Sequence, residues 1–408
     1  MLPSSFRSTT SFVALLLCLA LLPGLEGCSS LRTEPSKKAT KSEPPAKASR
    51  RAADAASSTS VPSHEAQAKS SARSALPTPY EQGQKAAQEG DFEQAFKWYA
   101  IGAENGDLEA QLALADLHAN GQGVKKNYAE ALTWYRRAAA SGSALAQAKM
   151  GALYQNGLGV KRDIEEAVRW YEQAANQGLA EAQFQLGLIY LQGRGAGTNA
   201  VLAEQWLRKA AEQGDVEASY QLGIMYQEGR GVPTNDVEAL HWYQQAADKG
   251  HPKSQYALGL MHYMGSEGVK QNYGEAIRWY KLAAQRGLAE AQNSLGVIYA
   301  EGKGVPVNQK EAVRWYTVAA QQGHIASQAN LATMYRYGLG IKMDYVEAYK
   351  WYSVAAAQAA QSNVSMKVAA EISREKITEK MTAAQIEDGK RRAQTWLERR
   401  ENKRLPGE

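Results

Sequence analysis

Residues 179–214 read LAEAQFQLGLIYLQGRGAGTNAVLAEQWLRKAAEQG, which is two amphipathic segments joined by a glycine-rich turn. The first segment carries apolar residues at helical spacing: Ala182, Leu186, Ile189 and Tyr190. The second carries a similar stripe: Ala203, Trp206, Leu207, Ala210 and Ala211. Gly193 and Gly214 can end the two helices. Because neither helix can bury its stripe alone, the stretch predicts a helix pair that depends on neighbouring pairs.

The same pattern recurs along most of the chain. Tryptophan returns at steps of 36 residues, with one step of 37, at Trp98, Trp134, Trp170, Trp206, Trp242, Trp279, Trp315 and Trp351. The extra residue falls in the turn at residues 265–268. A fixed period of this length is typical of stacked helical units. We therefore predict an all-α fold, a right-handed α/α solenoid of about eight helix pairs.

The beginnings of the second helices are also marked in the sequence. In seven units an Asn or Asp stands three residues before a Glu or Gln, as Asp163 stands before Glu166. A side chain of this type accepts a hydrogen bond from a backbone N–H in the first turn of a helix. The exception is Asn199, which is followed by Leu202. We therefore expect the unit around Trp206 to be irregular.

These residues resemble the Sel-like repeat family, a subclass of the tetratricopeptide-type helical repeats. The family pattern A-x-x-x-L-G-x-x-Y-x-x-G-x-G-V, followed by A-x-x-W-Y-x-x-A-A-x-x-G, is nearly intact at residues 182–214, 218–250 and 291–323. The resemblance implies a Sel-like array over residues 107–360. Residues 80–106 have a shorter turn and look more like a plain tetratricopeptide motif.

The final segment, residues 361–408, departs from the repeat. Thr382 and Gln385 form a capping-box pattern, and the ninth tryptophan, Trp396, falls outside the 36-residue step. A solenoid needs an atypical, polar final segment to cover its open end. We predict that residues 361–408 form capping helices.

The N-terminus has the pattern of an export signal. A short apolar run, residues 11–22, is followed by Leu25-Glu26-Gly27-Cys28. This stretch resembles a bacterial lipoprotein signal, in which residues 1–27 are removed and Cys28 carries the lipid. Glu26 departs from the pattern, where a small residue is usual. The alternative is an ordinary secretory signal, which would leave a soluble protein.

The positive charge of the chain lies in one segment. Residues 29–79 hold nine Lys or Arg against four Asp or Glu, whereas residues 80–408 hold 37 of each sign. This distribution argues against a nucleic-acid-binding surface on the repeats. The segment is rich in Ser, Ala, Lys and Pro and contains no aromatic residue before Tyr80. We predict that residues 28–79 form a disordered tether that links the lipid anchor to the array.

The sequence offers few residues for catalysis. Six histidines are scattered, only two cysteines are present, and no His-Glu-x-x-His motif occurs. We therefore predict no metal site, no cofactor, no small-molecule substrate and no catalytic residues. Some proteins of the family that this chain resembles have been described as binding or hydrolysing β-lactams, but those proteins are rich in disulfides. An envelope hydrolase is thus a weaker alternative.

The resemblance also indicates which surface is free. In tetratricopeptide-type arrays the first helix of each pair lines the concave surface. The residues that this register places there are larger and more apolar in the middle of the array than at its ends: Phe184, Leu188, Leu191, Tyr220, Ile224, Tyr256, Leu260 and Tyr263. We predict that they line a groove for a partner protein or peptide. The alternative is that a tightly wound superhelix buries them.

These patterns lead to one leading functional hypothesis. The protein is expected to be a non-catalytic scaffold on the periplasmic side of the outer membrane, held there by its N-terminal lipid. Its partners would be other envelope proteins or extended segments, and the resemblance suggests assembly of envelope or secretion complexes. The alternative hypothesis is a soluble periplasmic or secreted effector that interacts with a host.

Overall fold

The computed structural model describes residues 77–193, 198–359 and 363–404, and this part of the chain is helical throughout. Its only other regular feature is an isolated bridge between Ser266 and Val269. The predicted signal, Cys28 and nearly all of the predicted tether lie outside these residues. The helices are α2 (Pro79–Gln88), α3 (Phe92–Glu104), α4 (Leu108–Asn120), α5 (Tyr128–Ala140), α6 (Ala144–Asn156), α7 (Ile164–Asn176), α8 (Ala180–Gln192), α9 (Ala200–Glu212), α10 (Val216–Glu228), α11 (Asp236–Asp248), α12 (Pro252–Met264), α13 (Tyr273–Gln285), α14 (Ala289–Glu301), α15 (Gln309–Gln321), α16 (Ile325–Tyr337), α17 (Tyr345–Ala359), α18 (Val364–Thr378) and α19 (Ala383–Arg404).

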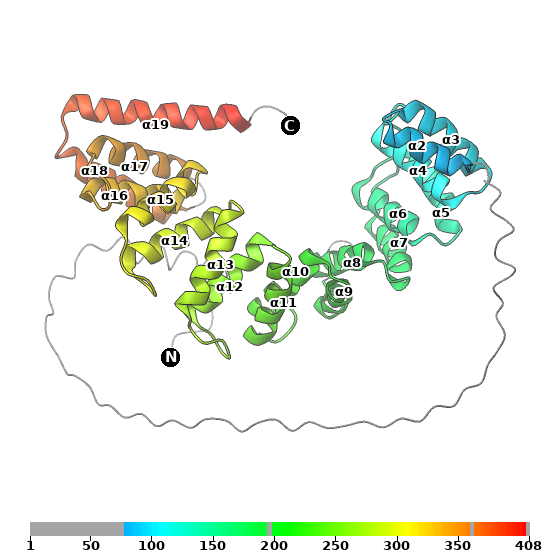
Figure 1. The fold of residues 1–408 in the computed structure, drawn as a ribbon, viewed down its shortest axis with the longest axis horizontal. Helices are drawn as coiled ribbons and strands as arrows, with labels where there is room; N and C mark the ends of the chain where they lie inside the picture. The colour runs from blue at the N-terminus through cyan, green and yellow to red at the C-terminus, as the bar shows by residue number, and fades with distance from the viewer. Residues whose placement is uncertain (1–76, 194–197, 360–362, 405–408) are drawn as a thin grey trace, which may run out of the picture.

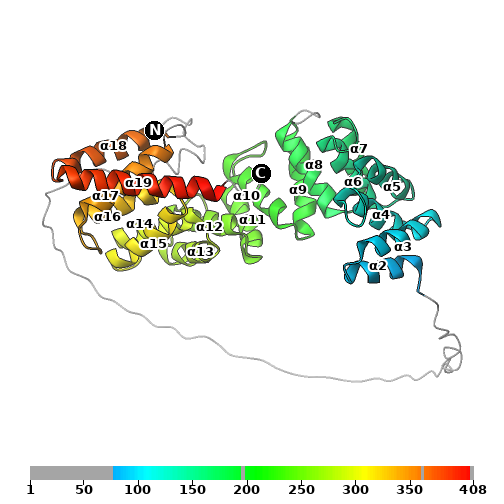
Figure 2. The same ribbon diagram turned by 90° about the horizontal axis from the view of Figure 1, so that it is seen from above.

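The helices from α2 to α17 form eight consecutive pairs. Each even-numbered helix packs against the odd-numbered helix that follows it, and each pair packs against the next pair. Figure 1 shows the pairs following one another along a curved array, with α2 and α19 at opposite ends. The same order from one end to the other is visible from above (Figure 2). The prediction of an all-α solenoid is confirmed.

The odd-numbered helices begin where the sequence predicts. Asp163 accepts a hydrogen bond from the backbone N–H of Glu166 at 3.0 Å. The irregular unit is capped as well, because Asn199 accepts from the N–H of Leu202 at 3.1 Å. These caps satisfy backbone groups that would otherwise lack a partner at the helix start.

The turns between the two helices of a pair depend on glycine. Gly159 has φ +69°, and a Cβ at this position would lie 2.5 Å from the carbonyl carbon of Tyr128. A side chain would therefore meet the backbone at the start of the preceding odd helix. The glycine lets the turn of one unit rest directly on the unit before it.

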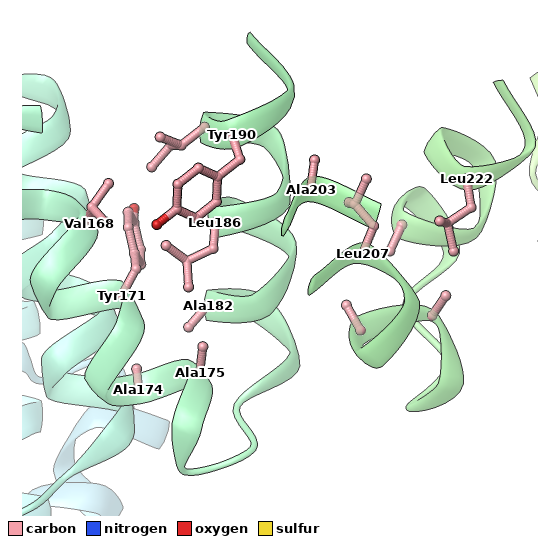
Figure 3. Packing of buried hydrophobic residues seen from close by; sticks show 14 of the residues in the cluster. Val168, Tyr171, Ala174, Ala175, Ala182, Leu186, Tyr190, Ala203, Leu207 and Leu222 are labelled. Carbon is pink, nitrogen blue, oxygen red and sulfur yellow. The ribbon is translucent and has the colours of Figure 1, made fainter. Parts of the chain in front are cut away.

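The core is continuous from pair to pair. In Figure 3, Ala175 of α7 lies beside Ala182 of α8, and small residues let the two helices approach closely. Leu186 is fully buried beside them. In each Trp-Tyr pair the tyrosine is more deeply buried than the tryptophan. Tyrosines such as Tyr243 are buried throughout the array, whereas four of the tryptophans are partly exposed: Trp98, Trp134, Trp170 and Trp315.

A row of buried glutamines crosses the joints between units. The side chain of Gln183 donates to the backbone oxygen of Ala175 at 3.1 Å and accepts from Gln213 of the next odd helix at 2.7 Å. The same bond to the preceding odd helix is made by Gln111, Gln147, Gln255, Gln292 and Gln328. We call this row the glutamine ladder. Each of these carbonyl groups also accepts from the backbone N–H of the glycine three residues later, so the ladder adds a second bond that joins each unit to the one before it.

The ladder is interrupted once. Ser219 occupies the ladder position in α10, and its hydroxyl donates to the backbone oxygen of Asp215 instead. Gln245 of α11 reaches back and donates to the backbone oxygen of Ala211 at 2.7 Å. A residue from a different helix thus makes the missing bond.

Two helices follow the eighth pair. The helix α19 packs along α17, where the rings of Trp396 and Trp351 meet edge to face at 5.8 Å. The guanidinium of Arg392 pairs with Glu347 at 2.7 Å. The predicted capping box is present, because the N–H of Gln385 donates to the hydroxyl of Thr382 at 3.3 Å. The ninth tryptophan therefore closes the end of the solenoid.

At the other end the first unit starts one residue earlier than the predicted boundary at 80. Thr78 and Glu81 form a capping box that begins α2 at Pro79. Within the residues that the structure describes, no helix is both long and apolar enough to cross a bilayer.

Candidate partner-binding face

The candidate surface lies on the even-numbered helices. It is formed by the residues 2, 5, 9 and 12 places after each N-cap, which in α10 are Glu217, Tyr220, Ile224 and Gln227. We call this surface the even-helix face. Figure 1 shows α8 and α10 on the inner side of the bend, with α9 and α11 outside them. Five other positions of α10 are buried: Ala218, Ser219, Leu222, Gly223 and Met225.

The structure places seven of the eight predicted residues at intermediate exposure. They are Phe184, Leu188, Leu191, Tyr220, Ile224, Tyr256 and Leu260. Most of them rest with one side on the core: Phe184 packs against the cluster around Leu186, and Tyr256 against the cluster around Tyr280. These side chains thus have one side against the core and the other toward solvent. The predicted groove and the alternative of a buried core each apply to one of these sides.

Tyr263 differs from the other seven. Its side chain is buried, with only 9% of its surface exposed, and its ring meets that of Tyr273 edge to face at 5.4 Å. The turn of residues 265–268 follows immediately and holds Val269 in the core. Tyr263 therefore belongs to the core of its unit and offers little surface to a partner.

Accessibility is concentrated in the middle of the array. Five places after the N-cap, Phe184, Tyr220 and Tyr256 are partly exposed. At the same place near the ends stand Leu112, Ala148 and Ala329, and all three are buried. The central three units therefore carry the only large aromatic side chains that this position offers to solvent in the described array.

The ring of Tyr220 stands near two other aromatic rings. Its ring lies 4.6 Å from that of His251 and 6.0 Å from that of Tyr243. The Nε2 atom of His251 is 3.5 Å from a carboxylate oxygen of Glu217. Burial raises the pKa of the Tyr220 hydroxyl, and the charges of Glu217, Glu228 and Glu290 raise it further.

Tyr256 stands in the next unit. Its ring packs against Tyr280 with 5.6 Å between centroids. Burial raises the pKa of its hydroxyl to about 12, and the charge of Glu290 acts in the same direction. Glu290 comes from α14 and influences both Tyr220 on α10 and Tyr256 on α12. The charge of one residue thus acts on the tyrosines of two other units.

Two histidines have a role that the sequence reading missed. His251 and His324 are the N-caps of α12 and α16, where each Nδ1 accepts from a backbone N–H, that of Ser254 at 3.2 Å and that of Ser327 at 3.3 Å. Their neutral form is required for this bond, and burial lowers the pKa of both rings. The sequence contained a signal for this role, because Asp107 and Asp215 stand at the corresponding position of other units and cap their even helices.

His118 and His262 stand where the pattern has Tyr. His118 is buried against Phe96, with 5.3 Å between the two rings, and burial lowers its pKa. His262 is partly buried in α12. Across the described residues, no group of three or more His, Cys, Asp or Glu is arranged to hold a metal ion.

The repeat profile identifies the family. The Sel1 repeat matches eight consecutive stretches, which together make up more than half of the chain: 75–107, 108–143, 144–179, 180–215, 216–251, 252–288, 289–324 and 325–359. The chain belongs to the Sel1 repeat family. The first stretch includes the unit that we expected to look more like a plain tetratricopeptide motif. Sel1 repeat proteins generally mediate protein–protein interactions and are generally not catalysts.

One solved structure supports this assignment, and a second is reported for comparison. A Sel1 repeat protein from Oxalobacter formigenes is 34% identical over 73% of this chain and 86% of that chain, with a TM-score of 0.60. The protein c5321, a protective antigen of uropathogenic Escherichia coli strains with an SLR fold, is 27% identical over 81% of this chain and 80% of its own, with a TM-score of 0.49. Among curated proteins, none matches this Sel1 repeat chain.

Proposed function

We propose that this Sel1 repeat protein is a scaffold of the bacterial envelope that holds a partner protein on the central part of its even-helix face. The observation that carries the proposal is the accessibility of the aromatic residues Phe184, Tyr220 and Tyr256 in the middle of the array, while the same position outside it holds the partly exposed Asn293 or the buried Leu112, Ala148 and Ala329. Partly exposed aromatic side chains on a rigid support are typical binding anchors. Each of the three is held from below by core residues, so little ordering is needed on binding.

The envelope location rests on the sequence of the N-terminus. The proposal is that residues 1–27 are removed, that Cys28 is acylated and that residues 28–79 link this lipid to the array. The anchor would keep the repeats on the periplasmic side of the outer membrane, where envelope or secretion complexes assemble. Mass spectrometry of the mature N-terminus tests the anchor. An unmodified N-terminus away from Cys28 would instead support a soluble periplasmic or secreted protein.

The partner-binding role is tested by truncating the three anchors together. The variant Phe184→Ala, Tyr220→Ala, Tyr256→Ala is compared with the native protein after crosslinking in the native envelope and identification of the captured proteins. We expect the captured set to lose its specific members. Capture of the same partners by a triple variant that remains folded would contradict the assignment of the face.

A matched control keeps the test specific. Val201, Val237 and Val307 are exposed at 60%, 54% and 58% and lie outside the even helices. Replacing all three by Ala removes a similar number of apolar side chains from the surface without touching the even-helix face. We expect this control to capture the native set. Helicity and melting temperature are measured for both triple variants, so that loss of folding is recognised.

A further inference from the structure

The part of the even-helix face around Tyr220 and Tyr256 combines aromatic rings with carboxylates. We propose that it binds a Lys or Arg side chain of an extended partner segment, with Tyr220 and Tyr256 contacting the side chain and Glu217 and Glu290 contacting its charge. The inference rests on the proposed function, because it names the chemistry of the partner held at that face. We call these four residues the cation site.

The aromatic part of the site is held in place by its neighbours. The ring of Tyr220 is flanked by His251 at 4.6 Å and by Tyr243 at 6.0 Å, and that of Tyr256 by Tyr280 at 5.6 Å. Tyr243 and Tyr280 are almost fully buried. The two outer rings therefore keep one fixed side toward solvent. A cation above such a ring is attracted by the negative face of the aromatic system.

The carboxylates lie on the same face. Glu217 and Glu290 both stand two places after an N-cap and are exposed. No Lys or Arg of the described residues forms an ion pair with either of them. The charge of Glu290 reaches the hydroxyls of Tyr220 and Tyr256 from a different unit. The two carboxylates and the two aromatic rings therefore belong to one surface of the array.

The neighbouring histidines do not cancel this charge. His251 contacts Glu217, and His324 is influenced by Glu290, but burial lowers the pKa of both rings. Both histidines also accept a hydrogen bond at Nδ1, which requires the neutral ring. The two rings therefore add little positive charge beside the carboxylates at neutral pH.

Two cations from the ends of odd helices stand near the site: the Nζ of Lys249 donates to the backbone oxygen of Gly214 at 2.6 Å, and the guanidinium of Arg286 lies against Gly250. Glu228 is paired with Arg230, and Lys253 is exposed two places after His251, between the units of the two carboxylates. Lys253 is the one cation on the face in this region, and it weakens the field of the carboxylates. It therefore provides a position where a substitution should strengthen binding.

The shape of a Lys or Arg side chain suits this arrangement. Both have an apolar stem that can lie along Ile224 and Leu260, which are partly exposed beside the two tyrosines. The charged head then reaches the carboxylates while the stem covers apolar surface. An acidic segment would meet the same carboxylates and be repelled, and an uncharged segment would leave them unused.

The test uses the full mature chain and a display library of random 12-residue peptides as the probe. We expect enriched peptides to share a Lys or Arg next to an apolar residue. With the best peptide, Glu217→Gln, Glu290→Gln should weaken binding about tenfold, and Lys253→Glu should tighten it severalfold. Raising the salt concentration should weaken binding of the native protein and leave the Gln variant nearly unaffected.

Two controls isolate the charge. Glu212→Gln removes an exposed carboxylate from α9, outside the even-helix face, and should leave affinity unchanged. In the peptide, norleucine in place of Lys keeps the stem and removes the charge, and it should reproduce the loss seen with the double Gln variant. Neither control changes the tyrosines or the fold.

The outcomes separate this inference from the proposed function. Enriched peptides that lack Lys and Arg, yet lose binding in the Phe184, Tyr220, Tyr256 triple variant, would overturn the cation site and leave the face as the binding surface. Peptides that bind the triple variant unchanged would overturn both. Failure to enrich any peptide, or equal binding by the native protein and the double Gln variant, would overturn the cation site.

Discussion

Gly259 of α12 lies directly against the ring of Tyr280 on α13, so that a Cβ at residue 259 would be 2.5 Å from the ring atoms Cδ1 and Cε1. In other units a glycine of the even helix makes the same contact with the tyrosine of the Trp-Tyr pattern: Gly83 and Tyr99, Gly151 and Tyr171, Gly223 and Tyr243, Gly296 and Tyr316. The two most regular motifs of the sequence are therefore two halves of one contact. It sets how closely the helices of a pair approach.

Replacing Gly259 by Ala should destabilise the protein. The ring of Tyr280 is 1% exposed and has no space to move away, so the added methyl must separate α12 from α13. Overpacking of this kind costs about 1 to 3 kcal/mol. Chemical unfolding followed by circular dichroism measures the change. The control is Gly274→Ala in α13, where the nearest atom is 3.3 Å away and φ is not left-handed, and which should be neutral or stabilising.

Replacing Trp242 by Ala should open a cavity between units. This ring is 3% exposed, and the guanidinium of Arg208 from the preceding unit lies 5.2 Å from it. A truncation of this size costs about 3 to 5 kcal/mol. Because units contact only their neighbours, the lesion should divide thermal melting into two segments. The control Trp206→Ala removes a partly exposed ring and should destabilise the protein less. If Trp242→Ala shows a single sharp transition within a degree or two of the native protein, the burial of Trp242 is contradicted.

Replacing Gln245 by Ala should cost about 0.5 to 1.5 kcal/mol, because it removes the side-chain hydrogen bond to the carbonyl of Ala211 and leaves that oxygen with its backbone bond from Gly214. Gln244→Ala removes only an exposed bond to Asp248 and should be nearly neutral. A further substitution, Ser219→Gln, places a ladder glutamine at the regular position. In the Gln245→Ala background it should recover stability, measured by the same unfolding curves. No recovery would show that the two positions are not interchangeable.

Acidification should destabilise the array through its buried histidines. Burial lowers the pKa of His251 and His324 in the folded state below the ordinary value of 6.5. The unfolded chain then binds protons more readily, so the free energy of unfolding is highest above that value and falls as the pH drops below it. Melting temperatures between pH 7.5 and 5 measure the slope.

The pH slope has its own control. The variant His251→Ser, His324→Ser keeps an N-cap acceptor, as Ser143 does in α6, but cannot take up a proton. It loses ring contacts at every pH, so its melting temperature is lower throughout, and the informative quantity is the slope. We expect a flatter slope, with a remainder from His118, whose pKa burial also lowers. An unchanged slope would exclude the two caps as its source.

The sequence was sufficient for the fold because the repeat carries its information locally. The spacing of Trp and the Asn or Asp before each odd helix predict helix pairs, and the bond from the N–H of Glu166 to Asp163 confirms one such start. The capping box of Thr382 and Gln385 was equally readable. These features depend on residues close in the chain, which is why spacing alone reveals them.

The candidate site was only partly readable. Its columns followed from the helix register, but the exposure of each residue depends on how tightly the array winds, which no single unit specifies. Tyr256 and Tyr263 look alike in sequence, yet one is partly exposed and the other is buried beside a longer turn. The charge of Glu290 raises the pKa of Tyr220 from two repeats away, an effect that spacing along the chain does not predict.

That longer turn also bears on how such an array can change during evolution. The extra residue near Gly265 is absorbed in the turn closed by the bonds between Ser266 and Val269, and α12 and α13 both keep 13 residues. The insertion therefore shifts neither the glutamine ladder nor the contact of Gly259 with Tyr280. The turns at this edge of the solenoid can therefore accept inserted residues, or an engineered epitope, while the helices keep their length and register.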